Sequence, residues 1–221
     1  MRYEYDHVGR KLYTYEKINN SAEVLLAENR YNEIGQLKDK AQGDRIQTTS
    51  YVYNERGWLT EKIAPMFAMQ LKYNDGTILR FNGDITNQLW GTPGSLTNNF
   101  TYSYDALGRL LSGDTGTGTY EKDITYDLMG NILTLNRNGT GVQNYSYNPA
   151  ASGNRLNSVS GGAIRSYSYD GNGNATGDGI NTLTYNLVNL PATVTGGSTI
   201  NYTYDATGRK LKRVTGGVTT D

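Results

Sequence analysis

The feature that most constrains the fold is a short motif that recurs from one end of the chain to the other. Its pattern is an aromatic residue, one variable residue, a tyrosine, Asp or Asn, two variable residues and a glycine. The clearest copies are Tyr102-Ser-Tyr104-Asp105-Ala-Leu-Gly108-Arg109 and Tyr202-Thr-Tyr204-Asp205-Ala-Thr-Gly208-Arg209. Because a motif that returns roughly every twenty residues is the signature of a repeat architecture, we expect a series of small units.

Further copies fill most of the chain. Four close relatives contain, in turn, Tyr3, Tyr5, Asp6 and Gly9; Tyr51, Tyr53, Asn54 and Gly57; Tyr126, Asp127 and Gly130; and Tyr167, Tyr169, Asp170 and Gly173. Weaker copies centre on Tyr31, Tyr73, Tyr147 and Tyr185. We therefore predict one array of about ten repeats over residues 1–221, with an irregular insertion at about 74–100. We also expect this array to be a fragment of a longer protein.

Each repeat is predicted to be a β-hairpin. In Tyr102-Ser-Tyr104 the aromatic residues alternate with a small polar one, which places both rings on one face of a strand. Asp105 can then accept backbone N–H groups in a turn, and Gly108 supplies the positive φ that closes it. Isolated hairpins are marginal in water, so successive units must pair edge to edge. The predicted fold is all-β: one continuous, curling, open sheet.

Two segments depart from this pattern. In the insertion we expect an extra strand over Phe81–Trp90, followed by a loop over Gly91–Asn99 that is rich in turn residues. Helix signals are poor everywhere except at Asn20–Asn29, which has a cap-like start and helix-forming residues. That segment could equally connect two strands. Pro149 and Pro191 are interpreted as turn residues.

Charge and cysteine content exclude several classes of function. The 21 Lys and Arg residues balance 21 Asp and Glu residues, so no basic footprint indicates nucleic-acid binding. The one basic cluster, Arg209–Arg213, is predicted to be a solvated strand end. No cysteine is present, which removes disulfides and thiolate sites, and no apolar run is long enough to span a bilayer. The N-terminus lacks a secretory signal, so an export signal is expected elsewhere.

Candidate chemical residues are better explained by structure. The single histidine, His7, occupies a variable turn position without a nucleophile motif, and we expect it to face solvent. The aspartates at positions 6, 105, 127, 170 and 205 all begin turns, so backbone capping explains them. Asp170–Asp178 has oxygen-bearing residues at alternate positions, but it lacks the glycine and the glutamate of a calcium loop. We therefore predict no catalytic, metal or cofactor site.

The repeated Tyr-x-Tyr-Asp-x-x-Gly-Arg/Asn motif, followed by an aliphatic residue, resembles the YD repeats of RHS-repeat proteins. That family includes bacterial toxin shells, wall-associated surface proteins and the animal teneurins. The resemblance covers nearly the whole chain and implies a β-sheet wound into a hollow shell. In the toxin branch it further implies an enclosed C-terminal effector that is released by self-cleavage. The Pro- and Asp-containing cleavage motif of that branch has no counterpart here.

Three functions stay open. The first is a non-catalytic segment of a secreted or cell-surface shell, whose partners are further repeats or a C-terminal effector of the same polypeptide. The second is an adhesin whose exposed tyrosines bind glycans or proteins. The third is an enzyme, for which the residues offer no nucleophile, metal set or cofactor loop. Tyrosine rings packed against the neighbouring repeat favour the shell, whereas a row of exposed rings favours the adhesin.

Overall fold

The computed structural model describes residues 1–148, 154–162 and 164–220. These residues form 22 β-strands, and they contain no helix. The predicted all-β class and the hairpin repeats are confirmed. The chain divides into two compact units, Met1–Tyr120 and Glu121–Asp221, and each is described by itself.

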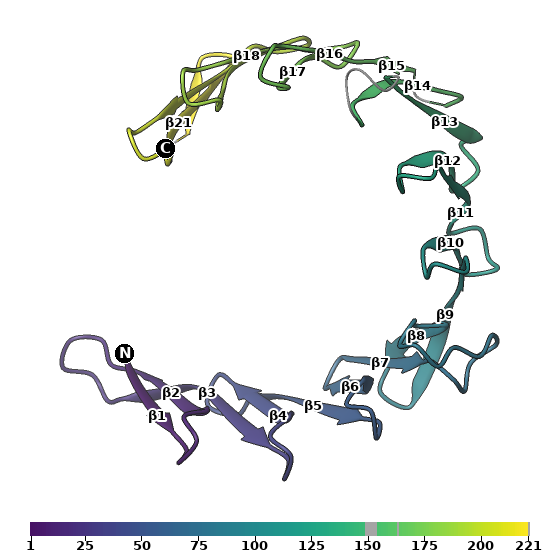
Figure 1. Ribbon diagram of the computed structural model, residues 1–221. Helices are drawn as coiled ribbons and strands as arrows, with labels where there is room; N and C mark the ends of the chain where they lie inside the picture. Colours follow the sequence, from purple (N-terminus) through teal and green to yellow (C-terminus); the bar gives the residue numbers. More distant parts are fainter. Residues whose placement is uncertain (149–153, 163, 221) are drawn as a thin grey trace. The chain divides into compact units, whose positions relative to one another are not determined.

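In the first unit, ten strands pair antiparallel in the order of the chain (Figure 1). The unit also includes Tyr120, the first residue of β11. The ten strands are β1 (Arg2–Tyr5), β2 (Lys11–Glu16), β3 (Val24–Tyr31), β4 (Leu37–Gln42), β5 (Gln47–Tyr53), β6 (Leu59–Ala64), β7 (Phe67–Lys72), β8 (Asn87–Thr92), β9 (Ser95–Tyr104) and β10 (Leu110–Asp114).

The second unit repeats the same order in two ladders, β11 to β15 and β16 to β22. Tyr167 interrupts what would otherwise be one strand, which separates β15 from β16. The strands are β11 (Tyr120–Tyr126), β12 (Ile132–Arg137), β13 (Val142–Tyr147), β14 (Leu156–Ser160), β15 (Arg165–Ser166), β16 (Ser168–Tyr169), β17 (Ala175–Gly177), β18 (Thr182–Tyr185), β19 (Pro191–Thr195), β20 (Ile200–Tyr204), β21 (Lys210–Thr215) and β22 (Val218–Thr220).

The buried apolar residues are few and are spread along the sheets. They are Leu25, Ala41, Ala68 and Tyr73 in the first unit and Ile124, Leu135 and Val159 in the second. Most strands therefore bury only part of their side chains, and the described residues share no central core. As in other repeat arrays, each hairpin depends on contacts with its immediate neighbours.

The insertion differs from the sequence prediction. The expected strand over Phe81–Trp90 begins only at Asn87, and the expected loop over Gly91–Asn99 belongs largely to a regular hairpin. Pro93 and Gly94 alone form its turn, and β8 pairs with β9 on either side. The Asn- and Thr-rich segment was wrongly predicted as a loop because pairing with a neighbouring strand outweighs the weak β-propensity of asparagine.

Two further expectations are corrected. The helix considered at Asn20–Asn29 does not form, because Val24–Tyr31 pairs with β2 and buries Leu25 and Glu28. The alternative interpretation of that segment, a strand connection, holds for residues 17–23. Pro191 is the first residue of β19 and not a turn residue, a position that tolerates a missing N–H. Pro149 lies outside the described residues.

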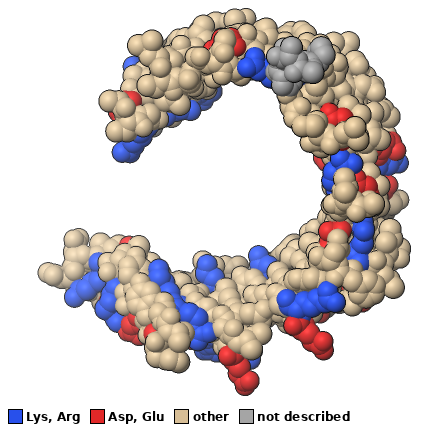
Figure 2. Space-filling model, in the orientation of Figure 1, with Lys and Arg blue, Asp and Glu red and all other residues tan. Residues whose placement is uncertain are grey.

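Charged side chains are interspersed over the face that Figure 2 shows, and acidic groups lie between the basic ones. The basic cluster at Arg209–Arg213 leads into β21, where Lys210, Lys212 and Arg213 are exposed. Its prediction as a solvated strand end is confirmed. The prediction of one array over residues 1–221 stays a prediction.

Candidate functional site

Each Asp-x-x-Gly motif closes a hairpin loop through its own carboxylate. At Asp105, Oδ1 accepts hydrogen bonds from the backbone N–H groups of Leu107 and Arg109, both at 2.9 Å. The N–H of Gly108 donates to the carbonyl of Asp105 at 3.2 Å. The same pair of bonds to one side-chain oxygen occurs at Asp6, Asn54, Asp127, Asp170, Asn186 and Asp205. These carboxylate and amide side chains are thus engaged in turn formation.

The turn glycines adopt the left-handed conformation. The φ angle of Gly108 is +77°, as predicted, and those of the equivalent glycines are +83° at Gly9, +80° at Gly57, +88° at Gly130 and +86° at Gly208. Gly173 has a φ of +90°. In the loop that begins at Asn186, Asn189 takes the glycine position with a φ of +59°. The position therefore demands a residue that tolerates positive φ.

At Asp6, Asp105, Asp127 and Asp170, the residue after the glycine binds the second oxygen of the motif carboxylate. The guanidinium Nε of Arg109 lies 2.6 Å from Asp105 Oδ2, and Arg10 pairs with Asp6 at the same distance. The backbone N–H of Arg109, followed by its guanidinium, lowers the pKa of the Asp105 carboxyl, although desolvation opposes this shift. The Arg-or-Asn preference after the glycine was visible in the sequence, but its role was not recognised.

A β-bulge follows every regular turn, a feature that the sequence analysis missed. In the hairpin of β5 and β6, Tyr53 pairs with Leu59, whereas the adjacent Val52 pairs with Glu61, so Thr60 is the extra residue. In seven further hairpins the register shifts at the same place, between the second aromatic residue of the motif and the residue before it. These are the hairpins of Tyr5, Tyr31, Tyr126, Tyr147, Tyr169, Tyr185 and Tyr204. Bulges twist a strand and redirect its side chains.

We call the second strand of each hairpin its return strand. The bulge leaves one backbone carbonyl of the return strand without a hydrogen-bond partner in the strand that pairs with it next. The pairing of β4 with β5 ends at Asp39 and Ser50, so the carbonyl of Leu37 lies beyond it. The hydroxyl of Tyr53 donates to this carbonyl at 3.0 Å. Since a backbone carbonyl in a partly buried position needs a hydrogen-bond donor, the tyrosine of one repeat completes the hairpin of the repeat before it.

This bond recurs along the chain, and we refer to the series as the tyrosine ladder. In five further cases the acceptor is likewise the first residue of the preceding return strand: Tyr31 to Lys11 at 3.1 Å, Tyr73 to Leu59 at 2.8 Å, Tyr147 to Ile132 at 3.0 Å, Tyr169 to Leu156 at 2.8 Å and Tyr185 to Ala175 at 2.9 Å. Tyr104 donates to Ile85 at 2.7 Å, just before β8. Tyr5 and Tyr204 make no such bond to the described residues.

Arginine and tryptophan side chains cover several rings of the tyrosine ladder. The guanidinium carbon of Arg10 lies 4.7 Å from the ring centre of Tyr31, and that of Arg155 lies 5.6 Å from Tyr169. Where Trp58 replaces the arginine after the turn glycine, its ring centre lies 5.0 Å from that of Tyr73. These contacts join the turn of one repeat to the strand of the next.

Most tyrosines are consequently withdrawn from solvent. All 19 tyrosines lie within the described residues, and only Tyr3 and Tyr5, on the edge strand β1, are exposed. The other predicted repeat aromatics, at positions 51, 53, 102, 104, 126, 167, 169, 202 and 204, are all partly buried. Packed rings are the arrangement that favours a shell over an adhesin with exposed tyrosines.

The remaining candidate residues have structural environments. His7 is exposed in the first turn, as predicted. In the segment considered for calcium, Asp170 binds the backbone and side chain of Asn174, and Asp178 binds those of Asn181. Within the described residues, no three His, Cys, Asp or Glu side chains gather in a way that could hold a metal ion.

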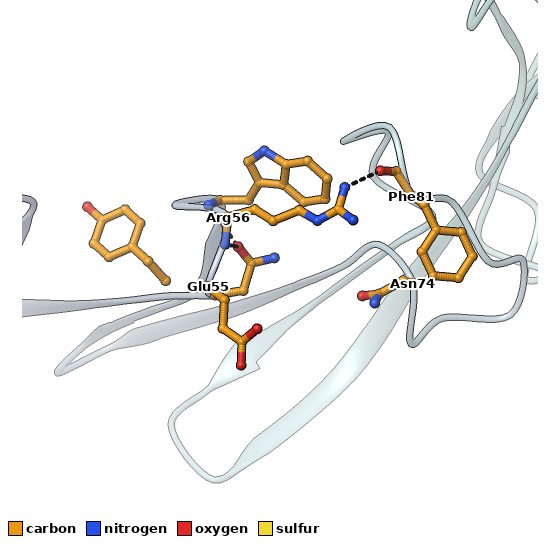
Figure 3. A pocket seen from close by; sticks show the side chains of 7 residues that line it. Glu55, Arg56, Asn74 and Phe81 are labelled. Carbon is orange, nitrogen blue, oxygen red and sulfur yellow. Dashed lines mark hydrogen bonds between the residues drawn. The ribbon is translucent and has the colours of Figure 1, made fainter.

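One hollow in the first unit lies where the repeat pattern changes. It has a volume of about 420 Å³ and is lined by Tyr53, Asn54, Glu55, Arg56, Trp58, Asn74 and Phe81. Figure 3 shows Arg56 extending from the turn toward Phe81, whose carbonyl accepts a hydrogen bond from Nη1 at 2.5 Å. Asn74 lies beside the Phe81 ring. The turn of one repeat and the long β7–β8 connection thus form the two walls of the hollow.

The comparisons with known proteins agree with the repeat geometry. The family model described as the teneurin YD-shell matches residues 64–219. The chain belongs to the teneurin YD-shell family. Among the curated proteins, no match is found.

Two solved structures share the fold of this chain. The Tc holotoxin pore of Photorhabdus luminescens matches with a TM-score of 0.62 and 17% identity, covering 99% of this chain and 14% of that chain. The TcdB2–TccC3 complex without its hypervariable C-terminal region matches with a TM-score of 0.61 and 16% identity, with the same two coverages. At these identities the likeness establishes the fold, and the chain spans a small part of each neighbour.

Over the ranges that the structure describes, no helical segment has the length and apolar character that a membrane span requires.

Proposed function

We propose that this chain is a non-catalytic structural segment of a secreted or cell-surface RHS-repeat shell that encloses or displays another polypeptide. The tyrosine ladder carries this proposal. It places the most abundant aromatic side chain of the protein between repeats, where it stabilises the array and is withheld from ligands. Rings packed between repeats in this way support a structural role in a shell.

The polypeptide partner is proposed to belong to the same protein. Support comes from the family, and from a neighbouring complex whose description names a hypervariable C-terminal region. In such a polymorphic-toxin scaffold, the repeats would surround a C-terminal effector. Membership of a shell family also supports the absence of catalysis by the repeats themselves.

Further repeats are the proposed partners at the edge of β1. The outer edge of this strand is unpaired in the described structure, and Tyr5 is 54% exposed. Six ladder tyrosines bind the carbonyl of the first residue of a preceding return strand, so we expect Tyr5 to bind the return strand of another YD hairpin in the same way. Unpaired strand edges recruit strands in this way.

The adhesin alternative receives less support, because Tyr3 and Tyr5 do not make a row of exposed rings. Both lie on β1, and the Nζ atom of Lys11 lies 4.2 Å from the ring centre of Tyr3.

Limited proteolysis of the full-length parent protein tests the proposal. The native parent and a parent unfolded in urea are treated with the same protease, and fragments are identified by mass spectrometry. We expect a polypeptide outside the repeats to survive in the native sample and to be degraded in the unfolded one. Equal degradation in both samples, with no co-purifying polypeptide, would refute the shell.

A further inference from the structure

The hollow beside Trp58 contains polar groups that the fold leaves without partners. In the regular turn at Asp105, both side-chain oxygens are occupied, because Arg109 binds the second one. In the turn at Asn54, the second side-chain atom is the amide Nδ2, a donor, and the residue after the glycine is Trp58, so this bond is not made. Asn54 Oδ1 still accepts the N–H groups of Arg56 and Trp58, both at 3.0 Å. Its amide Nδ2 has no hydrogen-bond partner among the described residues.

Two more polar side chains that line the hollow also lack a hydrogen-bond partner among the described residues. Neither the amide of Asn74 nor the carboxylate of Glu55 has a partner in the described structure, and both side chains are exposed. Arg56 uses Nη1 for the carbonyl of Phe81, which leaves further N–H groups of its guanidinium for a ligand. Donors and acceptors that the turn itself does not use therefore line one hollow.

An aromatic ring completes the wall. Phe81 is 59% exposed, although it stands in a connection that is otherwise well anchored. Trp58 contributes less free surface, because Tyr73 and Arg56 already contact its ring and the loop at Gly83 lies against it. Phe81 thus offers the apolar face of the hollow.

The β7–β8 connection, which forms one wall of the hollow, is held in place by its own hydrogen bonds without a ligand. Thr86 is fully buried, and its hydroxyl lies 3.2 Å from the carbonyls of both Lys72 and Tyr73. Asn87 is 3% exposed, and its Oδ1 accepts the N–H of Thr77 at 2.8 Å. The N–H of Arg80 donates to Tyr73 at 3.0 Å. A preformed wall lowers the ordering cost of binding.

We infer that this hollow binds a neutral carbohydrate of one or two sugar rings. Sugar hydroxyls both donate and accept hydrogen bonds, as do the amides of Asn54 and Asn74, while the C–H face of a pyranose fits an aromatic ring such as Phe81. Glu55 disfavours an anionic ligand and Arg56 a cationic one. The volume of about 420 Å³ lies within the range of small-molecule sites.

The experiment is a titration of the full chain with neutral sugars. Glucose, galactose, N-acetylglucosamine and their β-linked disaccharides are screened by NMR, with the side-chain amide signals of Asn54 and Asn74 as the readout. The best sugar is then titrated by calorimetry against Phe81→Ala and Asn74→Ala. Both substitutions leave the fold intact, because Arg56 binds the Phe81 backbone and the Asn74 amide has no partner. Leu128→Ala and Asn20→Ala, which change exposed residues far along the chain from the hollow, are the controls.

We expect each hollow variant to weaken binding about tenfold or more, equivalent to roughly 1.4 kcal/mol, and each control to bind as the native chain does. Three results would overturn the assignment: no sugar shifts the two amide signals, the hollow variants bind unchanged, or a peptide binds there in place of sugars. The protease test of the shell does not involve this hollow, so either idea can fail alone.

Discussion

The hydroxyl of Tyr53 donates to the backbone carbonyl of Leu37 at 3.0 Å and so ties one hairpin to the hairpin before it. The carbonyl is available because a one-residue bulge follows each turn and the next ladder ends at Asp39. A local irregularity, repeated in every regular hairpin, thereby becomes the means by which the repeats hold one another.

Removing this hydroxyl tests the tyrosine ladder directly. Tyr53→Phe should lower the free energy of unfolding by about 1 kcal/mol, because the carbonyl of Leu37 loses its donor while the ring is retained. Urea titration followed by circular dichroism measures the change. Tyr5→Phe is the matched control, since Tyr5 has no such acceptor in the described structure, and it should be neutral. Equal effects of the two substitutions would contradict a role for the bond.

Substitutions at the turn glycine distinguish the effect of backbone geometry on stability from the effect of side-chain size. At Gly108 an added Cβ would meet nothing closer than 3.8 Å, so only the φ of +77° resists substitution. We expect Gly108→Val to cost about 1–2 kcal/mol or more and Gly108→Asn clearly less, as Asn189 already occupies an equivalent position. Thermal melts compare the two variants, and indistinguishable midpoints would count against the turn.

Acid should destabilise the second unit through Asp178. The N–H and side-chain amide of Asn181, with the N–H of Ile180, lower the pKa of this carboxyl from 3.8 to about 2. A carboxyl with a lowered folded pKa contributes stability that is complete above 3.8 and is lost as the pH falls toward about 2, because the unfolded state takes up the proton first.

The check is the midpoint of thermal unfolding at several pH values across this window. Asp178→Asn keeps an oxygen acceptor but cannot ionise, so its midpoint should fall less steeply with acid than that of the native chain. Parallel curves for the two proteins would show that Asp178 does not contribute to the acid sensitivity.

The anchoring of the β7–β8 connection is tested at Gly76. A Cβ added there would lie 2.2 Å from Thr86 Oγ1 and 2.5 Å from Asn87 Oδ1, and both of these residues are buried. Gly76→Ala should therefore cost about 1–3 kcal/mol, in the range of other overpacked sites. Gly197→Ala, with open space around it, should have little effect. Denaturant titration measures the free energy of unfolding of both variants. A Gly76→Ala protein as stable as the native chain would rule out the tight packing.

The sequence by itself determined the repeat, the all-β class and the chemistry of each turn. These follow from local rules: alternating aromatics such as Tyr102 and Tyr104 specify a strand, while Asp105 and Gly108 specify a reversal within four residues. It also led to the family, because the spacing of these motifs is regular. The helix considered at Asn20–Asn29 and the loop expected at Gly91–Asn99 failed because pairing with a neighbouring strand outweighs local propensity.

Only the tertiary structure decided what the tyrosines do. A Tyr53 ring in sequence is equally suited to a sugar, a partner or another repeat, and its acceptor, the carbonyl of Leu37, carries no side-chain signature. The sequence did not reveal the hollow at Asn54 and Phe81 for the same reason. It is formed by the turn at Asn54 together with the β7–β8 connection, which is distant in the sequence. Contacts between segments far apart in the chain depend on register and on bulges, and these emerge when the strands pair.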